Sequence, residues 1–153
     1  MRLTNTLKQW LAEKEWDEEP EIDEEKQTST TISGITIGDF KLKLFFEVME
    51  KGEVFKIYAY FLDAKVPEKK LDEVQKLITA ISHKMVVGAL HLLRDERMIR
   101  YYGAIDVENA AFEPAHISNL LTAGLRTMEH NLPRYMAICF GGKTAEEAFE
   151  MED

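Results

Sequence analysis

Apolar residues near the start of the chain recur every three or four positions, which is the period of an α-helix with one buried face. Thr4 or Asn5 can cap such a helix, because a side-chain oxygen at its first position accepts a backbone N–H. The pattern predicts a first helix that ends near Trp16. Its buried stripe would consist of Leu3, Leu7, Trp10 and Leu11.

From residue 40 the period changes to two, which indicates strands that bury one face. Residues 40–49 and 55–62 both alternate in this way. Lys51-Gly52 supplies a tight turn between them, so the two runs form a predicted hairpin. Residues 30–37 are predicted as a preceding strand.

A second helix is predicted to start at Pro67, because proline is favoured at the first helical position. Two further strands follow, at residues 85–93 and 98–107. Residues 94–97 join them and are all charged, which suits an exposed turn. The stripe of the second helix would be Leu71, Val74, Leu77, Ile78 and Ile81.

Pro114 is predicted to open a long third helix, and Pro133 to bend it, because proline removes one backbone donor. A short C-terminal helix is predicted at 144–152. The main order is helix, three strands, helix, two strands, helix, which is typical of an α+β fold with an antiparallel sheet. The stripe of the long helix would be Ile117, Leu120, Leu121, Leu125, Met128 and Leu132.

The composition favours one domain over residues 1–153, because a 153-residue chain that is 45% hydrophobic can bury roughly 70% of its unfolded surface. The single Cys139 cannot form an internal disulfide, which favours a reducing cytoplasm. No stretch approaches the roughly twenty apolar residues that span a bilayer, and no signal peptide is recognised. We therefore expect no membrane partner.

Acidic residues exceed basic residues, giving a formal net charge of −9, and they gather in residues 13–26. An acidic surface repels phosphate backbones, so we expect no nucleic-acid partner. The acidic run is interpreted as a solvated connection, with an interaction segment as the alternative.

GGKT at residues 141–144 resembles part of a phosphate-binding loop, in which Lys143 and Thr144 would serve a nucleotide-dependent enzyme. Such a loop follows a buried strand and opens a long helix. Here a helical pattern precedes it. The local alternative is that Gly141 or Gly142 ends the long helix, and that Thr144 with Glu147 forms a capping box.

Other chemistry finds little support in the sequence. The histidines at 83, 91, 116 and 130 lack the spacing that places two imidazoles on one helix face, so no metal is expected. Cys139 and the serines have no motif around them that would supply a base. We expect neither catalytic residues nor a cofactor.

The second face of the predicted sheet is more informative. Alternation places Tyr101 and Ile105 on the core face and sends their neighbours outward. Aromatic residues and arginine are enriched in protein interfaces, so this surface is a candidate site for a partner or a second copy. Coverage by a helix is the alternative. The candidate residues are Phe45, Tyr58, Tyr60, Arg100 and Tyr102.

Four segments in order, VPEKKLDEVQKLI (66–78), VVGALHL (86–92), MIRYYGAIDVE (98–108) and GGKTAEEAF (141–149), resemble the YbjN family over roughly residues 28 to 150. These bacterial and cyanobacterial proteins are described as sensory transduction regulators. The resemblance implies a fold like that of type III secretion chaperones, and a small, acidic, cytoplasmic protein that is commonly a dimer and has no established catalytic residues.

The functional hypothesis is a non-enzymatic cytoplasmic regulator or adaptor that binds protein or peptide, as a homodimer. It would use the outer face of the sheet or an exposed strand edge, where an added strand could contact Tyr58, Tyr60 and Tyr102. A structural subunit of a larger assembly and a nucleotide-dependent enzyme remain as alternatives.

Overall fold

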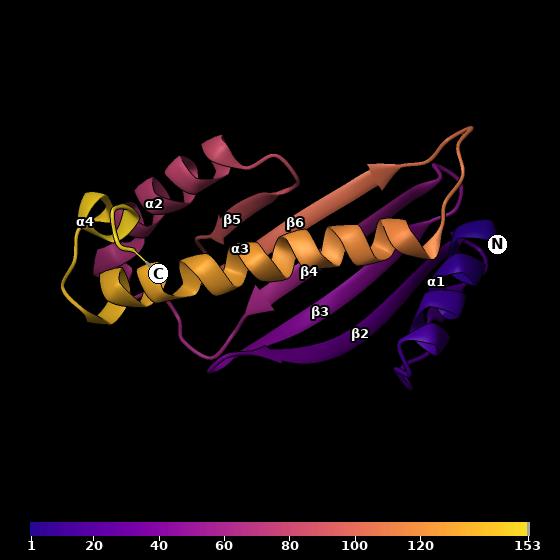
Figure 1. Cartoon of the computed structure of the whole chain (residues 1–153), viewed down its shortest axis with the longest axis horizontal. Coiled ribbons are helices and arrows are strands. Elements are labelled where there is room, and N and C mark those ends of the chain that lie inside the picture. The colour runs from indigo at the N-terminus through magenta and orange to yellow at the C-terminus, as the bar shows by residue number, and fades with distance from the viewer. Residues whose placement is uncertain (153) are drawn as a thin grey trace.

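Six strands form one antiparallel sheet in the computed structural model, which describes residues 1–152 (Figure 1). Their order across the sheet is β1-β2-β3-β4-β6-β5. The predicted α+β class and element order are confirmed. The strands are β1 (Glu21–Asp23), β2 (Thr28–Ile37), β3 (Phe40–Met49), β4 (Val54–Phe61), β5 (Ala89–Leu93) and β6 (Met98–Asp106).

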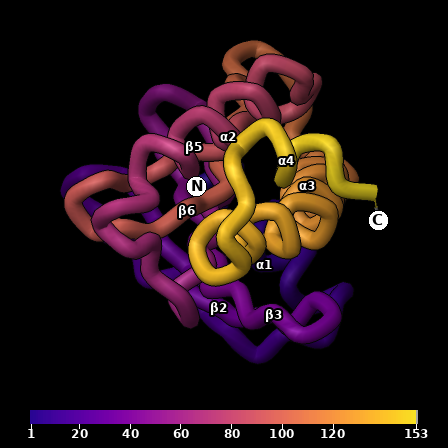
Figure 2. Tube along the Cα trace, turned by 90° about the vertical axis from the view of Figure 1, so that its left-hand side faces the viewer, coloured from indigo at the N-terminus to yellow at the C-terminus, as the bar shows by residue number. Residues whose placement is uncertain are grey.

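Helices pack on one face of this sheet (Figures 1 and 2). The longest helix, α3, crosses β4 and β6, α1 packs against β3, and α2 lies beside β5. The short α4 contacts both α2 and α3. The helices are α1 (Arg2–Glu13), α2 (Leu71–Lys84, entered through a 3-10 turn at Glu68–Lys70), α3 (Pro114–Phe140) and α4 (Ala145–Phe149).

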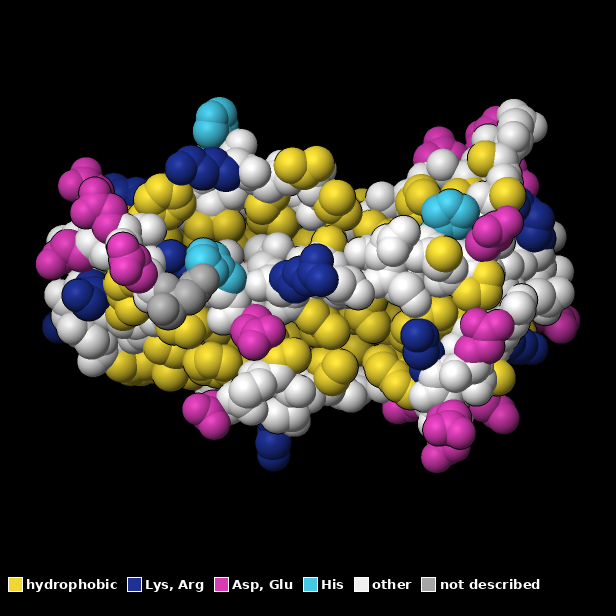
Figure 3. Space-filling view, in the orientation of Figure 1, with side chains coloured by type: hydrophobic (Ala, Val, Ile, Leu, Met, Phe, Trp, Pro, Cys, Tyr) yellow, Lys and Arg dark blue, Asp and Glu magenta, His cyan; other side chains and the backbone are white. Residues whose placement is uncertain are grey.

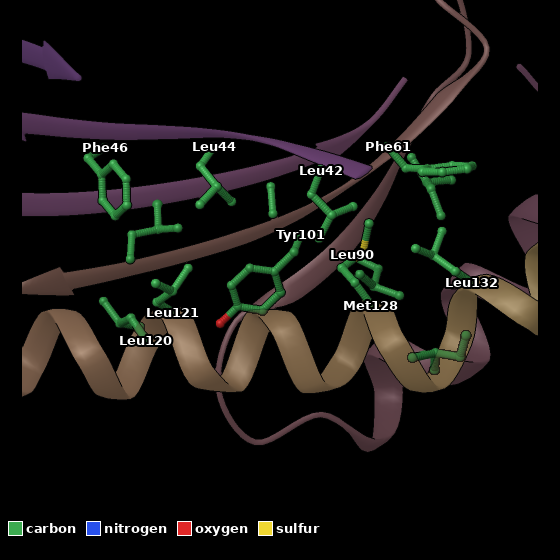
Figure 4. Close-up of a cluster of buried hydrophobic side chains, with 14 of the residues drawn as sticks. Leu42, Leu44, Phe46, Phe61, Leu90, Tyr101, Leu120, Leu121, Met128 and Leu132 are labelled. Atoms are coloured by element: carbon green, nitrogen blue, oxygen red, sulfur yellow. The ribbon is translucent and has the colours of Figure 1, made fainter. Parts of the chain in front are cut away.

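The core lies between the sheet and these helices, because every second strand residue points toward them (Figure 4). Tyr101 of β6 is fully buried opposite α3. A β-carbon built on Gly124 of α3 would lie 2.6 Å from Cδ2 of the Tyr101 ring, so only glycine lets helix and ring approach this closely. The strand side of the core includes Leu42, Leu44, Phe46, Val48, Phe55, Ile57, Ala59 and Phe61.

The start of α1 differs from the predicted cap. The helix begins at Arg2, and neither Thr4 nor Asn5 caps it. The carboxylate of Glu50, from the turn after β3, accepts the N–H groups of Leu3 (3.3 Å) and Thr4 (2.7 Å). Orphan donors at a helix start need an acceptor, and a residue distant in sequence supplies it. The predicted stripe is buried as expected.

The tight turn predicted at Lys51-Gly52 is present after β3. The residue with left-handed backbone is Glu53 (φ 52°), and Gly52 is not in that conformation. The N–H of Glu53 donates to the Glu50 carbonyl (3.2 Å), which closes a four-residue turn with Lys51 and Gly52 at its centre.

The strand predicted from residue 85 starts only at Ala89. Gly88 has left-handed backbone (φ 78°) and separates β5 from the preceding loop. Val86 in that loop is 96% exposed, although its apolar side chain favoured a strand.

The long helix α3 continues through Pro133 and ends at Phe140.

The acidic segment contains one element that the sequence pattern did not indicate. β1 lies within residues 13–26 and pairs with the first residues of β2. All three β1 residues are exposed, so no alternation marks them. On the helix-bearing side, acidic side chains gather toward both ends of the molecule (Figure 3). Among residues 1–152, no helix is both long and apolar enough to cross a membrane.

Candidate functional site

The sheet face opposite the helices, called the outer face here, carries all five predicted site residues. Strand pairing sets Phe45 opposite Tyr58, Tyr58 opposite Tyr102, and Tyr60 opposite Arg100. Each of the five is partly exposed. No helix among the described residues covers them, since the helices pack on the other face. The alternative of a covering helix is thereby removed.

Arg100 is the centre of this face. Its Nη1–H donates to the Tyr60 hydroxyl (2.9 Å), and its Nε–H donates to Nδ1 of His91 (3.1 Å). The guanidinium carbon lies 4.7 Å from the centre of the Tyr58 ring. These contacts hold a planar cation in one orientation, and further N–H groups of the guanidinium remain to bind a carboxylate.

The aromatic rings around Arg100 support one another. Tyr102 lies between Tyr58, at 5.3 Å between ring centres, and His91, at 5.5 Å in a stacked arrangement. Phe45 meets Tyr60 edge-on at 5.3 Å. Such pairs restrict side-chain rotation, so this surface is ordered before any partner binds.

Burial and charge change the acid–base behaviour of two of these groups. Burial, followed by the charge of Arg100, lowers the pKa of His91 below its ordinary 6.5. A neutral imidazole agrees with the geometry, because Nδ1 must be unprotonated to accept from Arg100. Burial, and then Glu47, raise the pKa of Tyr58 above 10.0, so its hydroxyl keeps its proton at neutral pH.

We predict that Arg100→Gln raises the pKa of His91, because one of the two causes of its depression is removed. The pKa should stay below 6.5, since burial remains. The folded state resists protonation, so His91 should not affect stability above pH 6.5 and should destabilise the fold as pH falls below it. Titration of the imidazole by NMR measures both pKa values, and an unchanged value in the variant would contradict the contact.

His91 was not among the predicted site residues. Its position on the outer face depends on the pairing of β5 with β6, which sets it opposite Arg100. The alternation of β5 alone is short, and the sequence did not show that this strand starts at Ala89. The predicted strand at residues 85–93 gave no register with β6, so the sequence did not indicate that His91 lies beside Arg100.

The outer face and the strand edges are separate surfaces. Tyr58 and Tyr60 lie on β4 in the middle of the sheet, and Tyr102 lies on β6. A strand added beside β2 would stand three strand spacings from β4, or about 14 Å. It would not touch these tyrosines, so the predicted combination of strand addition with tyrosine contacts is not possible at that edge.

The GGKT segment joins two helices. Gly142 has left-handed backbone (φ 70°) just after α3, and the Thr144 hydroxyl accepts the N–H of Glu147 (3.2 Å) while Glu147 accepts that of Thr144 (3.0 Å). The predicted capping box is confirmed. No strand precedes the segment and α4 has only 5 residues, so the phosphate-loop geometry is missing.

His91, His116 and Cys139 each have a local structural role or a buried position. Nδ1 of His116 accepts the N–H of Glu113 (2.9 Å) at the start of α3, and His91 accepts from Arg100. Cys139 is buried, and burial raises its pKa to about 11, which makes it a poor nucleophile. Within residues 1–152, no three His, Cys, Asp or Glu side chains come together to hold a metal.

Comparison with known families agrees with this architecture. The model of YbjN, described as "Putative bacterial sensory transduction regulator", matches residues 4–134. The chain belongs to the YbjN family. Curated proteins give no match to this YbjN-family chain. This family description suggests a regulatory or adaptor role.

Proposed function

We propose that this YbjN-family protein is a non-enzymatic cytoplasmic regulator that acts as a homodimer and binds an acidic segment of a partner protein on its outer face. The observation that carries the proposal is the cluster of Arg100 with Tyr58 and Tyr60 on a face that no helix of residues 1–152 covers. Tyrosine and arginine are the residues that most often dominate binding energy at interfaces.

The charge of the outer face supports an acidic partner. The whole chain has a net charge of −9, yet the outward positions of the central strands β3, β4 and β6 carry more cations than carboxylates. Glu21 and Asp23 of β1 add two carboxylates at one edge of the same face. A basic region at the centre of this face, on an acidic protein, attracts an acidic partner segment. On the central strands the cations are Lys41, Lys43, Lys56 and Arg100, and the carboxylates are Glu47 and Asp106.

Apolar contacts add to this charge. Phe45 lies beside Lys43, whose Nζ is 5.4 Å from its ring centre, and Ile32 continues the row at 50% exposure. Met49 and Leu62 are 41% and 43% exposed at the ends of the same face. A segment that alternates carboxylates with apolar or aromatic side chains would match this surface.

Selection of phage-displayed random peptides on the immobilised protein tests the proposal. The wild-type protein should enrich peptides rich in Asp and Glu that also carry an apolar side chain. Replacing Tyr58 and Tyr60 together by serine should abolish the enrichment, because both rings contact Arg100. Its circular dichroism should stay unchanged, since neither side chain belongs to the buried core.

Phe140→Ser is the matched control, because Phe140 is 59% exposed at the end of α3, away from the outer face. It should enrich the same peptides as the wild type. Enrichment of basic peptides, equal enrichment by the double serine variant, or its unfolding would contradict a partner site at the tyrosines.

A further inference from the structure

Among the described residues 1–152, one edge of the sheet has no neighbouring strand over most of its length. β1 pairs only with residues 28–30 of β2, although β2 continues to Ile37. Thr31 is fully buried, but each residue from Ile32 to Ile37 is partly or fully exposed. On an edge strand every second residue points its N–H and C=O groups away from the sheet, ready to pair with another strand.

This edge also lacks the usual protection. Edge strands of soluble proteins commonly carry charges or proline, which discourage pairing with other chains. Residues 27–38 contain no charged residue and no proline, in a chain that is 31% charged. Ile32, Ile35, Thr36 and Ile37 are β-branched, which favours an extended strand.

The opposite edge of the sheet is covered. The Leu90 N–H of β5 donates to the Ser82 hydroxyl (3.0 Å), and that hydroxyl donates to the Leu90 carbonyl (3.1 Å). The Ser82 side chain of α2 thus hydrogen-bonds both backbone groups of Leu90, near the centre of β5. The two edges therefore differ, and only β2 presents a long uncharged backbone.

We propose that β2 pairs with β2 of a second copy of the chain, antiparallel, with the two-fold axis at Gly34. This inference locates the dimer contact of the proposed function and uses none of the five outer-face residues. The two sheets become one, and their outer faces lie on the same side. In this register Ile32 faces Thr36 of the second copy, and Ser33 faces Ile35.

The register follows from the exposed length. When β2 pairs antiparallel with β2 of a second copy, the two residue numbers of every pair have the same sum. That sum is even, because paired side chains lie on the same face of the sheet. A sum of 68 pairs residues 32–36 with residues 36–32 of the second copy. In this register the pairing with the second copy ends before Thr31, which is fully buried, and before residues 28–30, which pair with β1. The Glu18 carboxylate accepts a hydrogen bond from the Ser33 hydroxyl (2.7 Å). The Ser33 side chain points to the helix side of the sheet, so this contact does not occupy the backbone groups at the β2 edge.

Charge favours a second copy as the occupant. Two chains of net charge −9 repel each other, and they approach most easily along a stretch that carries no charge. An acidic or basic peptide would gain nothing from this edge. Dimerisation should therefore strengthen as salt concentration rises, whereas binding of an acidic peptide to the outer face should weaken.

Two double variants with charges at the same two positions test the register. In Ile32→Glu/Thr36→Glu, two carboxylates face each other twice across the proposed contact. In Ile32→Lys/Thr36→Glu, each lysine faces a glutamate of the other copy. Both positions are exposed, and Glu at 36 lies opposite Lys41 on β3, so both variants should fold.

Sedimentation velocity over a concentration series measures the dimer dissociation constant. We expect a dimer for the wild type, and a constant at least about tenfold higher for Ile32→Glu/Thr36→Glu than for Ile32→Lys/Thr36→Glu, with the difference shrinking in high salt. A wild-type chain that stays monomeric, or equal constants for the two variants, overturns the proposal.

A cysteine at the two-fold axis gives an independent readout. Gly34→Cys should form an intermolecular disulfide under mild oxidation, because paired residues in antiparallel strands have Cα atoms about 4.5–5.5 Å apart, within disulfide range. A β-carbon at Gly34 lies 3.6 Å from the Leu42 carbonyl, an ordinary contact. The wild type, whose single Cys139 is buried, should form no intermolecular disulfide under the same conditions and serves as the control. Absence of cross-linked dimer contradicts the proposal.

Failure of this inference is distinguishable from failure of the proposed function. A monomeric wild type that still enriches acidic peptides through Tyr58 and Tyr60 removes the homodimer and its β2 contact, and leaves the partner site on the outer face. A dimer that enriches no peptide removes only the partner site. If a peptide protects the amides of residues 32–37 from hydrogen exchange while the chain stays monomeric, the edge binds a peptide and not a second copy.

Discussion

Replacing Tyr101 with alanine is expected to lower the free energy of unfolding by about 3–5 kcal/mol, a large share of the stability of a domain. The side chain is fully buried between the sheet and α3 (Figure 4). Its hydroxyl also donates to the Val87 carbonyl (3.2 Å), which fixes the loop before β5. Denaturant titration followed by circular dichroism measures the loss. Tyr101→Phe, which removes only the hydrogen bond, should cost about 1 kcal/mol.

Packing of the Tyr101 ring against Gly124 can be tested directly. The effect of Gly124→Ala on the free energy of unfolding should have opposite signs in the wild type and in Tyr101→Ala. In the wild type, Gly124→Ala places a β-carbon 2.6 Å from the Tyr101 ring and should destabilise the protein by about 1–3 kcal/mol. In Tyr101→Ala the ring is absent, and alanine is the better helix residue by about 1 kcal/mol, so the substitution should stabilise. Additive effects in this double-mutant cycle would contradict direct packing of ring against helix.

Arg100→Ala is expected to weaken binding of the selected acidic peptides by at least about 2 kcal/mol, which is roughly thirtyfold. The guanidinium is held by Tyr60 and His91, so it is in place before the partner arrives. Its removal also takes away the cation that lies over Tyr58. Fluorescence anisotropy of a labelled peptide gives the dissociation constant.

Two further variants separate charge from geometry at this position. Arg100→Lys keeps the charge and loses the planar hydrogen-bonding group, so its affinity should fall between those of wild type and alanine variant. Lys56→Ala removes a cation from the same face without disturbing the ring cluster, and should cost less than about 1 kcal/mol. Equal losses for Lys56→Ala and Arg100→Ala would show that the face contributes only general charge.

Alternation in the sequence was sufficient to place the five outer-face residues on one surface, because side chains of a strand point to opposite faces with a period of two. Tyr58, Tyr60 and Tyr102 are found where that pattern predicts. Their partnership with His91 was not predictable in the same way. It depends on register between strands, which a single strand does not encode.

Other differences have the same origin. Thr4 was a reasonable cap by local rules, yet Glu50 accepts the N–H groups at the start of α1, because folding brings a distant turn beside the helix. β1 carries no alternation and exists through its pairing with β2. Val86 looked like part of a strand, but Gly88 redirects the backbone after it.

By itself the sequence determined the periods of its helices and strands, the α+β class, the capping box at Thr144 and the outward direction of the aromatic residues. These properties arise from neighbours a few positions apart along the chain. Only the tertiary structure decided that Arg100 meets His91 and Tyr60, that Ser82 covers the β5 edge, and that the β2 edge stays open beyond β1. Such contacts join residues far apart in sequence, and the packing of the whole chain sets their distances.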